Sequence, residues 1–335
     1  MSAATLGLAE AASLAQAILV RHDTSEANAR SVARALVAAE ADGQPGHGLS
    51  RLPSYAAQAA AGKVDGHAVP TLEQGAAAAL RVDARNGFAF PALALAVDRL
   101  SSLGTESGIA AAAVHHSHHF GQAGYHVEQL AATGLIGLIF GNSPKAIAPW
   151  GGSEGIFGTN PIAFAAPRRT EPPLVIDLSL SKVARGKVMV AAKQGQPIPE
   201  GWALDSNGNP TTDAEAALQG TMLPMGNAKG AALVLMVEIL AAALTGARFG
   251  FEASSFFSAE GEPPGVGQFL VAIDPRVFSG DAFADRVETL IDAILEQPGT
   301  RLPGGRRLAQ RAAAARDGVE IPAGLYNELK ALSAN

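Results

Sequence analysis

The segment Gly46–Tyr55 carries three polar side chains that could act together on one small molecule. Arg51 and Tyr55 are four residues apart, which places them on one face of a helix, and His47 lies in the loop just before it. A guanidinium suits a carboxylate, an imidazole can transfer a proton near neutral pH, and a phenol hydroxyl can orient a substrate oxygen. The same spacing is also compatible with a surface helix that carries an incidental histidine.

A second group of histidines, His115, His116, His118 and His119, directly follows an alanine-rich, strand-like run. A metal site would need further ligands, and neither a His-Glu-x-x-His helix nor a pattern of partnered carboxylates accompanies the group. Neighbouring side chains in a strand also point to opposite faces of the sheet. We therefore expect no bound metal, and we expect one or two of these histidines to line a pocket.

Anion-binding candidates are scattered, and the nucleotide-binding fingerprints of Rossmann and P-loop folds are missing from the sequence. The turn Gly121–Gly124 could aim backbone N–H groups at a phosphate, although tight turn packing explains it equally well. Lys229 begins an apolar helix, where a bound anion or a lysine that reaches to solvent would account for it. A basic stretch near the C-terminus could likewise bind an anion or form a solvated surface. It comprises Arg301, Arg306, Arg307 and Arg311.

Composition and charge restrict the class of protein. The chain has 335 residues, 48% of them hydrophobic, and a net charge of −6, which argues against a basic nucleic-acid interface. It has no cysteine, which excludes disulfides, thiolate catalysis and cysteine-based metal centres. The amphipathic N-terminal segment lacks a basic start, and the apolar run 231–244 contains Glu238. We expect a cytoplasmic protein that does not enter a membrane.

The elements that must position these residues alternate between helix and strand in the middle of the chain. Amphipathic periodicity predicts helices at both ends, and alternation predicts a mixed central region. Helices are expected at 6–21, 25–41, 50–61, 91–103, 123–133 and 228–245 and from 281 onward, and strands at 79–83, 109–115, 135–140, 162–166, 174–178 and 268–273. The sequence thus predicts an α+β protein with a helical domain formed by 1–75 and 276–335 around a central domain at 76–275.

Several motifs, in this order along residues 8–332, resemble those of the malate/L-lactate dehydrogenase family. That family includes lactate, malate, sulfolactate and ureidoglycolate dehydrogenases and the Δ1-piperideine-2-carboxylate reductases. The motifs are ADGQPGHGLSRLPSY (41–55), SHHFGQAGY (117–125), NS and APWGG (142–152), GTNPIA (158–163), DLSLSKVARGK (177–187), IPEGWALD (198–205), PMGNAKG (224–230) and RLPG (301–304). Several ordered motifs together are far more specific than any single one.

The resemblance implies a non-Rossmann, sulfolactate-dehydrogenase-like fold and a homodimer that uses NADP or NAD. The implied reaction moves a hydride between the cofactor and a small 2-oxo or 2-hydroxy carboxylate such as malate, lactate or sulfolactate. His47 would be the proton donor or acceptor, with His119 as the alternative, and Arg51 would bind the substrate carboxylate beside Tyr55 and Thr159. The implied cofactor contacts are His119, Phe120, Gly121, Gln122, Ala123, Ser143, Asp177, Leu178, Ser179, Lys229, Pro303, Gly304, Gly305, Arg306 and Arg307.

Two positions depart from the family pattern. Gly46 stands where the family has serine, and Lys187 stands where the imine reductases have a relay aspartate. Both changes favour a 2-oxo acid over the alternative substrate, a cyclic ketimine. A relative that binds a metabolite without turnover is a further alternative. The choice between NADP and NAD is open, because Arg168 and Arg169 could meet a 2′-phosphate or belong to a surface loop.

Overall fold

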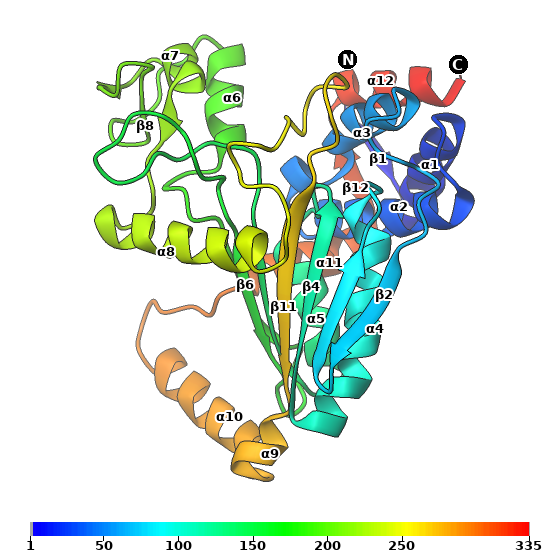
Figure 1. Cartoon of the computed structure of the whole chain (residues 1–335), viewed down its shortest axis with the longest axis vertical. Helices are drawn as coiled ribbons and strands as arrows, with labels where there is room; N and C mark the ends of the chain where they lie inside the picture. Colours follow the sequence, from blue (N-terminus) through cyan, green and yellow to red (C-terminus); the bar gives the residue numbers. More distant parts are fainter. Residues whose placement is uncertain (1–2, 335) are drawn as a thin grey trace.

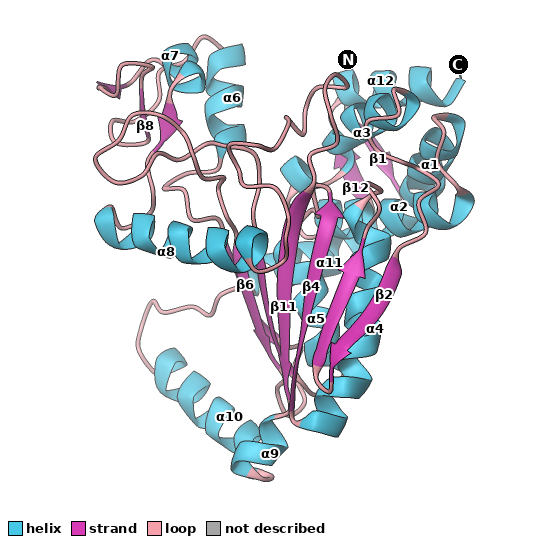
Figure 2. Cartoon of the chain, viewed as in Figure 1, coloured by secondary structure: helices cyan, strands magenta, loops and turns pink. Residues whose placement is uncertain are grey.

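A seven-stranded mixed sheet forms the centre of the computed structural model, which describes residues 3–334 (Figures 1 and 2). In spatial order the strands are β2 (Thr71–Ala76), β3 (Ala79–Asp83), β4 (Ile109–Ser117), β11 (Val266–Ile273), β5 (Ile136–Gly141), β6 (Ile162–Ala166) and β7 (Leu174–Leu178). Only β3 and β4 pair in parallel. The last of these seven strands along the chain, β11, lies antiparallel between β4 and β5. The fold is therefore mixed α/β, with no Rossmann topology.

Two helices, α4 (Ala89–Ser107) and α5 (Ala123–Ala132), pack against this sheet and bury its main core. Small residues allow the close approach. A Cβ at Gly137 of β5 would lie 3.0 Å from the carbonyl oxygen of Val127 in α5, so a larger residue there would push helix and strand apart. Alternate residues of β4, such as Ala110, Ala112 and Val114, point into this core, as the expected strand pattern requires.

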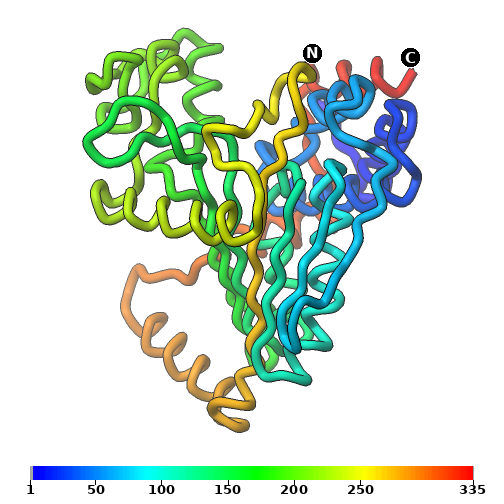
Figure 3. Tube along the Cα trace, in the orientation of Figure 1, coloured from blue at the N-terminus to red at the C-terminus, as the bar shows by residue number. Residues whose placement is uncertain are grey.

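A helical layer built from both chain termini covers one end of the sheet (Figure 3). It contains α1 (Leu8–Arg21), α2 (Glu26–Ala41), α3 (Leu52–Ala60), α11 (Gly305–Asp317) and α12 (Ala323–Ala334). The short strands β1 (Ala4–Leu6) and β12 (Val319–Ile321), which the sequence did not predict, pair and join the two ends. Ser25 caps α2, because its hydroxyl accepts a hydrogen bond from the Asn28 N–H at the start of that helix.

A small lobe, at the left in Figure 1 and across from the helical layer, was missed by periodicity because its elements are short. It holds α6 (Arg185–Lys193), α7 (Ala214–Gln219), β8 (Ala203–Leu204), β9 (Pro210–Thr211) and β10 (Thr221–Met222). The predicted long helix 228–245 is α8 (Ala228–Glu238) followed by a π-helical turn, η3 (Ile239–Ala243). Buried Glu238, at this junction, accepts hydrogen bonds from Asn142, Asn160 and the Gly250 N–H.

The segment after β11 lies at the opposite end of the sheet from α1 (Figure 1). Its helices are α9 (Pro275–Ser279) and α10 (Ala282–Leu295). Glu288 of α10 pairs with Arg168 at 2.6 Å, and Arg169 pairs with Asp285. These carboxylates bind the two arginines that were considered for a cofactor phosphate. The division into 1–75 with 276–335 and 76–275 stays a prediction, although α9 and α10 do not join the helical layer.

None of the helices within residues 3–334 combines the length and the hydropathy needed to cross a bilayer.

Candidate active site

The residues expected to act on substrate and cofactor gather along one edge of the seven-stranded sheet. Strands β4 and β5 both pair antiparallel with β11, so they end at the same edge. Strand β6 runs opposite to β5 and begins there, and β7 ends there. This edge carries His119 after β4, Ser143 after β5, Thr159 before β6, and Asp177 to Ser179 at the end of β7.

Two tight turns place His47 and Arg51 at this edge. His47 ends the 3₁₀ turn η1 (Pro45–His47) and Arg51 ends the next one, η2 (Leu49–Arg51), so Arg51 lies just before α3 rather than on its face with Tyr55 as predicted. Gly48 joins the turns, and a Cβ there would lie 2.2 Å from a Glu40 carboxylate oxygen. That carboxylate also accepts the Leu49 N–H at 2.8 Å, so Glu40 fixes the turn and requires glycine beside it.

The two histidines proposed for proton transfer lie side by side. The rings of His47 and His119 are parallel within 7°, with centroids 5.5 Å apart. The Tyr55 hydroxyl and His119 Nδ1 form a hydrogen bond of 2.5 Å that joins residues 64 positions apart in the sequence. A nitrogen held in this way fixes the ring and leaves Nε2 for a substrate. The structure therefore brings His47, Tyr55 and His119 together.

Burial shifts the pKa values of the side chains in this cluster. Desolvation, helped by the positive charge of Arg51, lowers the pKa of His47 to about 4 and that of His119 well below its usual 6.5. Desolvation raises the pKa of Tyr55, so its hydroxyl stays protonated. Both imidazoles are neutral at pH 7. A neutral imidazole is ready to accept a proton from a substrate hydroxyl.

The cluster also has polar atoms that lack a partner within residues 3–334. Arg51 Nε donates to the Gly46 carbonyl at 2.6 Å, but Arg51 Nη1 and His47 Nδ1 are buried and unpaired. An unpaired buried donor costs about 1–3 kcal/mol. A small carboxylate would accept from Arg51 Nη1 and offset its charge. The site thus fits an anionic ligand at Arg51.

The lowered pKa values of the buried histidines predict that acid destabilises the folded protein. Buried His126 of α5, whose pKa is lowered to about 4 mainly by desolvation, serves as the example. Its folded-state pKa lies below the unfolded value, so the unfolded state binds more protons as the pH falls below 6.5. Because His126 is protonated more readily in the unfolded state, we expect it to lower the free energy of unfolding by about 2 kcal/mol as the pH falls from 7.5 to 5.

Urea denaturation of wild type and His126→Gln at both pH values checks this. The variant starts less stable because the His126 bond to the Phe120 carbonyl is changed, but it should lose less stability on acidification. An equal loss in both proteins would contradict the assignment.

A loop between η3 and β11 covers the histidines. The ring of Phe256 meets those of His118 and His119 edge-on, with centroids 5.3 and 5.2 Å away. The Arg51 guanidinium lies 4.6 Å from the ring centroid of Phe257, a cation–π contact. Gln58 links the loop to the site, since its amide donates to the Phe256 carbonyl and its side-chain oxygen accepts from His118 Nε2.

Lys63 fixes the same loop to the helical layer, and sequence reasoning missed it. It is only 3% exposed, and its ammonium donates to the carbonyls of Ser255, Ser258 and Glu260 at 2.8–2.9 Å. A lone lysine after a helix gives no sequence signal for three carbonyl partners 192 to 197 residues away. Lys63 therefore positions the loop that closes over His119.

Replacing Lys63 by methionine should loosen this loop. Hydrogen bonds to charged groups contribute about 1.5–3 kcal/mol, so we expect a loss of about 2–3 kcal/mol of stability. We also expect a raised KM for the carboxylate substrate, because Phe257 no longer supports Arg51. Steady-state kinetics and urea denaturation test this, with the exposed Lys330→Met as the matched control. A purely structural lysine would lower stability and leave KM unchanged.

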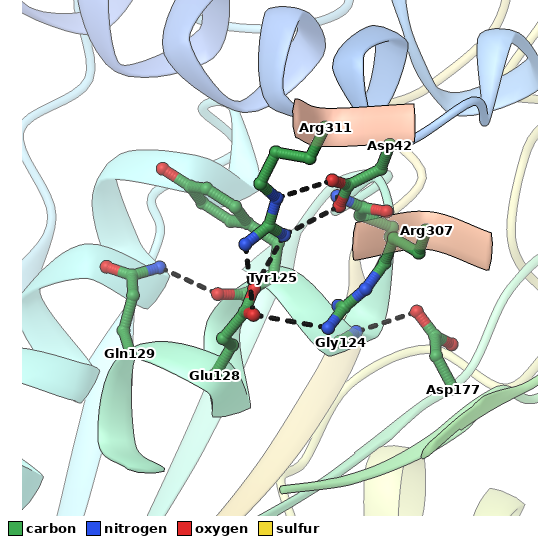
Figure 4. Close-up of polar contacts among 9 residues, drawn as sticks. Asp42, Gly124, Tyr125, Glu128, Gln129, Asp177, Arg307 and Arg311 are labelled. Carbon is green, nitrogen blue, oxygen red and sulfur yellow. Dashed lines mark hydrogen bonds and ion pairs between the residues drawn. The ribbon is translucent and has the colours of Figure 1, made fainter. Parts of the chain in front are cut away.

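The expected cofactor residues Asp177 and Arg307 meet at the start of α5 (Figure 4). The Asp177 carboxylate accepts the Gly124 N–H at 2.7 Å, so that N–H is already bound and is not free for a phosphate. Arg307 pairs with Glu128 at 3.1 Å, and its buried Nε has no partner among residues 3–334. Arg311, part of the basic stretch, bridges Glu128 and Asp42.

The other expected contacts are spread over the edge. The Thr159 N–H donates to the Ser143 hydroxyl at 3.1 Å, and the Thr159 carbonyl accepts from the Leu180 N–H. Phe120 is packed in the core against Gly141, whereas Lys229 is exposed at the start of α8. The remaining expected contacts lie at the ends of three elements: Gly121 and the buried Gln122 and Ala123 at the start of α5, Leu178 and Ser179 at the end of β7, and Pro303, Gly304, Gly305 and Arg306 at the start of α11.

Comparisons with known proteins agree on one family. A model described as malate/L-lactate dehydrogenase matches residues 7–330. The (2R)-3-sulfolactate dehydrogenase (NADP(+)) of Chromohalobacter salexigens is 55% identical over 326 residues, 97% of each chain. The Δ1-pyrroline-2-carboxylate/Δ1-piperideine-2-carboxylate reductase of Pseudomonas putida is 44% identical, over 93% of this chain and 92% of the relative.

Solved structures share the fold over nearly the whole chain. The Δ1-piperideine-2-carboxylate reductase from Pseudomonas syringae superposes with a TM-score of 0.93 at 41% identity, covering 98% of this chain and 99% of that one. The sulfolactate dehydrogenase from Methanocaldococcus jannaschii gives a TM-score of 0.91 at 30% identity, covering 99% and 97%.

Proposed function

Because this chain belongs to the malate/L-lactate dehydrogenase family and is an NAD(P)-dependent oxidoreductase, we propose that it interconverts a small 2-hydroxy and 2-oxo carboxylate. Within that class we place sulfolactate ahead of malate and lactate, and NADP ahead of NAD. The support for this ranking is the 55% identity to an NADP-dependent sulfolactate dehydrogenase. The observation that carries the proposal is the buried, half-unpaired guanidinium of Arg51 beside two neutral histidines.

The residues of this site match the needs of the reaction. When bound, a nicotinamide cofactor would supply or take up the hydride. Arg51 binds the substrate carboxylate, and an imidazole takes the hydroxyl proton during oxidation or returns it during reduction. Phe256 and Phe257 keep water from the reacting atoms when the loop is closed. Bound carboxylate offsets the charge of Arg51, which makes protonation of the imidazoles easier.

The second candidate is a cyclic ketimine reductase. Reductases of this kind are among the relatives, at 38–45% identity. The serine typical of the family is Gly46 here, and a Cβ at Gly46 would meet no heavy atom within 4 Å, so Gly46→Ser should fit without strain. Lys187, in place of the relay aspartate, is exposed on α6. Neither residue offers the carboxylate or hydroxyl that such a relay would use.

A substrate panel tests the proposal. NADPH and NADH are each mixed with sulfopyruvate, oxaloacetate, pyruvate, Δ1-pyrroline-2-carboxylate or Δ1-piperideine-2-carboxylate, and the loss of reduced-nicotinamide absorbance is recorded. We expect the highest kcat/KM with NADPH and sulfopyruvate. A rate confined to the imines would replace the proposal by the second candidate. No turnover with any pair would favour a relative that binds without catalysis.

Two expectations from the sequence stay predictions beside this one. A homodimer predicts a mass in solution twice that of the chain, measurable by light scattering. A cytoplasmic location can be tested by fractionating the native host.

A further inference from the structure

Three potential metal ligands meet at the end of the β3–β4 pair, on residues that the proposed reaction does not use. They are Asp83, His115 and His116, and one ligand atom from each lies within 4.8 Å of the others. We propose that this cluster binds a divalent transition-metal cation of the zinc type. The proposal differs from the sequence-based expectation of no metal, which assumed that neighbouring histidines point to opposite faces.

A β-bulge breaks that alternation. Val114 pairs with Gln268 and Ser117 pairs with Val266, so two residues of β4, His115 and His116, face the single residue Gly267 of β11. Such a bulge redirects side chains. The two imidazoles consequently lie together, with ring centroids 4.5 Å apart. The parallel register of β3 places Asp83 opposite His115 and completes the group.

The backbone holds this arrangement although it is strained. His116 has φ +48°, in the left-handed region that non-glycine residues rarely adopt. Strained residues of this kind tend to occur at functional sites. The carbonyls of His115 and His116 accept the Ala84 and Asn86 N–H groups, and the Arg85 N–H donates to the Asp83 carboxylate. These bonds preorganise the three ligand atoms before any cation binds.

A bound cation would explain the close contacts of His116 Nδ1 with both Asp83 and His115. His116 Nδ1 lies 2.9 Å from Asp83 Oδ1 and 3.1 Å from His115 Nδ1. If His116 Nδ1 carries a proton, it donates to Asp83 and has no lone pair for His115. If it carries none, its contact with Asp83 brings two lone pairs together. A cation bound by all three atoms satisfies both contacts at once.

Ligand type and access favour zinc. Two imidazoles and a carboxylate are common zinc ligands at about 2.0–2.2 Å, and tetrahedral ligands at that radius lie about 3.3 Å apart. Side-chain exposures of 51% for His116 and 35% for Asp83 leave a fourth position open to water. His116 also lines a cavity of about 330 Å³ together with Glu252, Glu262 and Arg248, so two carboxylates against one guanidinium leave its lining net acidic and favour the approach of a cation.

The test measures binding of ZnCl₂ and CoCl₂ alone to the full chain after treatment with EDTA, by calorimetry and by the visible spectrum of Co²⁺. We expect one equivalent per chain. His116→Gly removes a ligand and suits the left-handed backbone, so it should weaken binding by more than about 100-fold without disturbing the fold.

His67→Ala is the matched control, because His67 and Asp23 form an exposed pair at 3.2 Å that lacks a second imidazole. It should leave the affinity unchanged. No binding to wild type, or equal affinities in wild type and His116→Gly, would overturn the proposal. The measurement uses neither substrate nor nicotinamide, so its outcome is independent of the proposed reaction.

Discussion

Replacing His119 by glutamine should lower kcat for oxidation of the 2-hydroxy acid by about 10²–10⁴, the contribution of a positioned acid–base group. His119 is preferred over His47 because its Nδ1 is held by Tyr55, which leaves Nε2 for the substrate hydroxyl. His47 Nδ1 has no such partner within the described chain. We expect His47→Gln to cost less, and Tyr55→Phe to cost about tenfold through the lost orientation of His119.

Steady-state kinetics of the three variants separate the roles. The exposed His67→Gln serves as the matched histidine control, and unfolding curves show whether each variant keeps its fold. If His47→Gln has the larger effect, the two histidines exchange roles. If both variants keep wild-type turnover, neither imidazole transfers the proton, and the proposed reaction at this site is abandoned.

Replacing Arg51 by methionine should lower kcat/KM for the carboxylate substrate by about 10²–10³, because truncating one partner of a buried charged pair costs about 2–5 kcal/mol. Most of the loss should appear in KM, since the carboxylate is bound in the ground state and in the transition state alike. Arg51→Lys keeps the charge but loses the planar fork, so it should restore only part of the loss.

The same substitution has an electrostatic signature. Arg51 lowers the pKa values of His47 and His119 through its charge, so both should rise in Arg51→Met. The pH profile of reduction, which needs a protonated imidazole, should then extend to higher pH. Arg34→Met, at an exposed arginine of α2, is the control and should change neither KM nor the profile. An unchanged KM in Arg51→Met would remove the carboxylate assignment.

The sequence determined the local structure well where an element is long enough to show a periodic pattern. The amphipathic repeats indicated the helices at both ends, and alternation indicated the strands that became β3 to β7 and β11. The short elements of the small lobe and the β1–β12 pair left no periodic signal. Ordered motifs also identified the family, since they record the residue types that the chemistry requires.

Other features depended on contacts between residues far apart in the chain. Tyr55 reaches His119, Lys63 reaches a loop near residue 258, and β11 inserts between β4 and β5. The bulge that unites His115 and His116 exists only in the register between β4 and β11. The lowered histidine pKa values arise from desolvation by these same contacts. Local sequence sets backbone preference and side-chain type, whereas strand register, burial and charge environment are properties of the assembled tertiary structure.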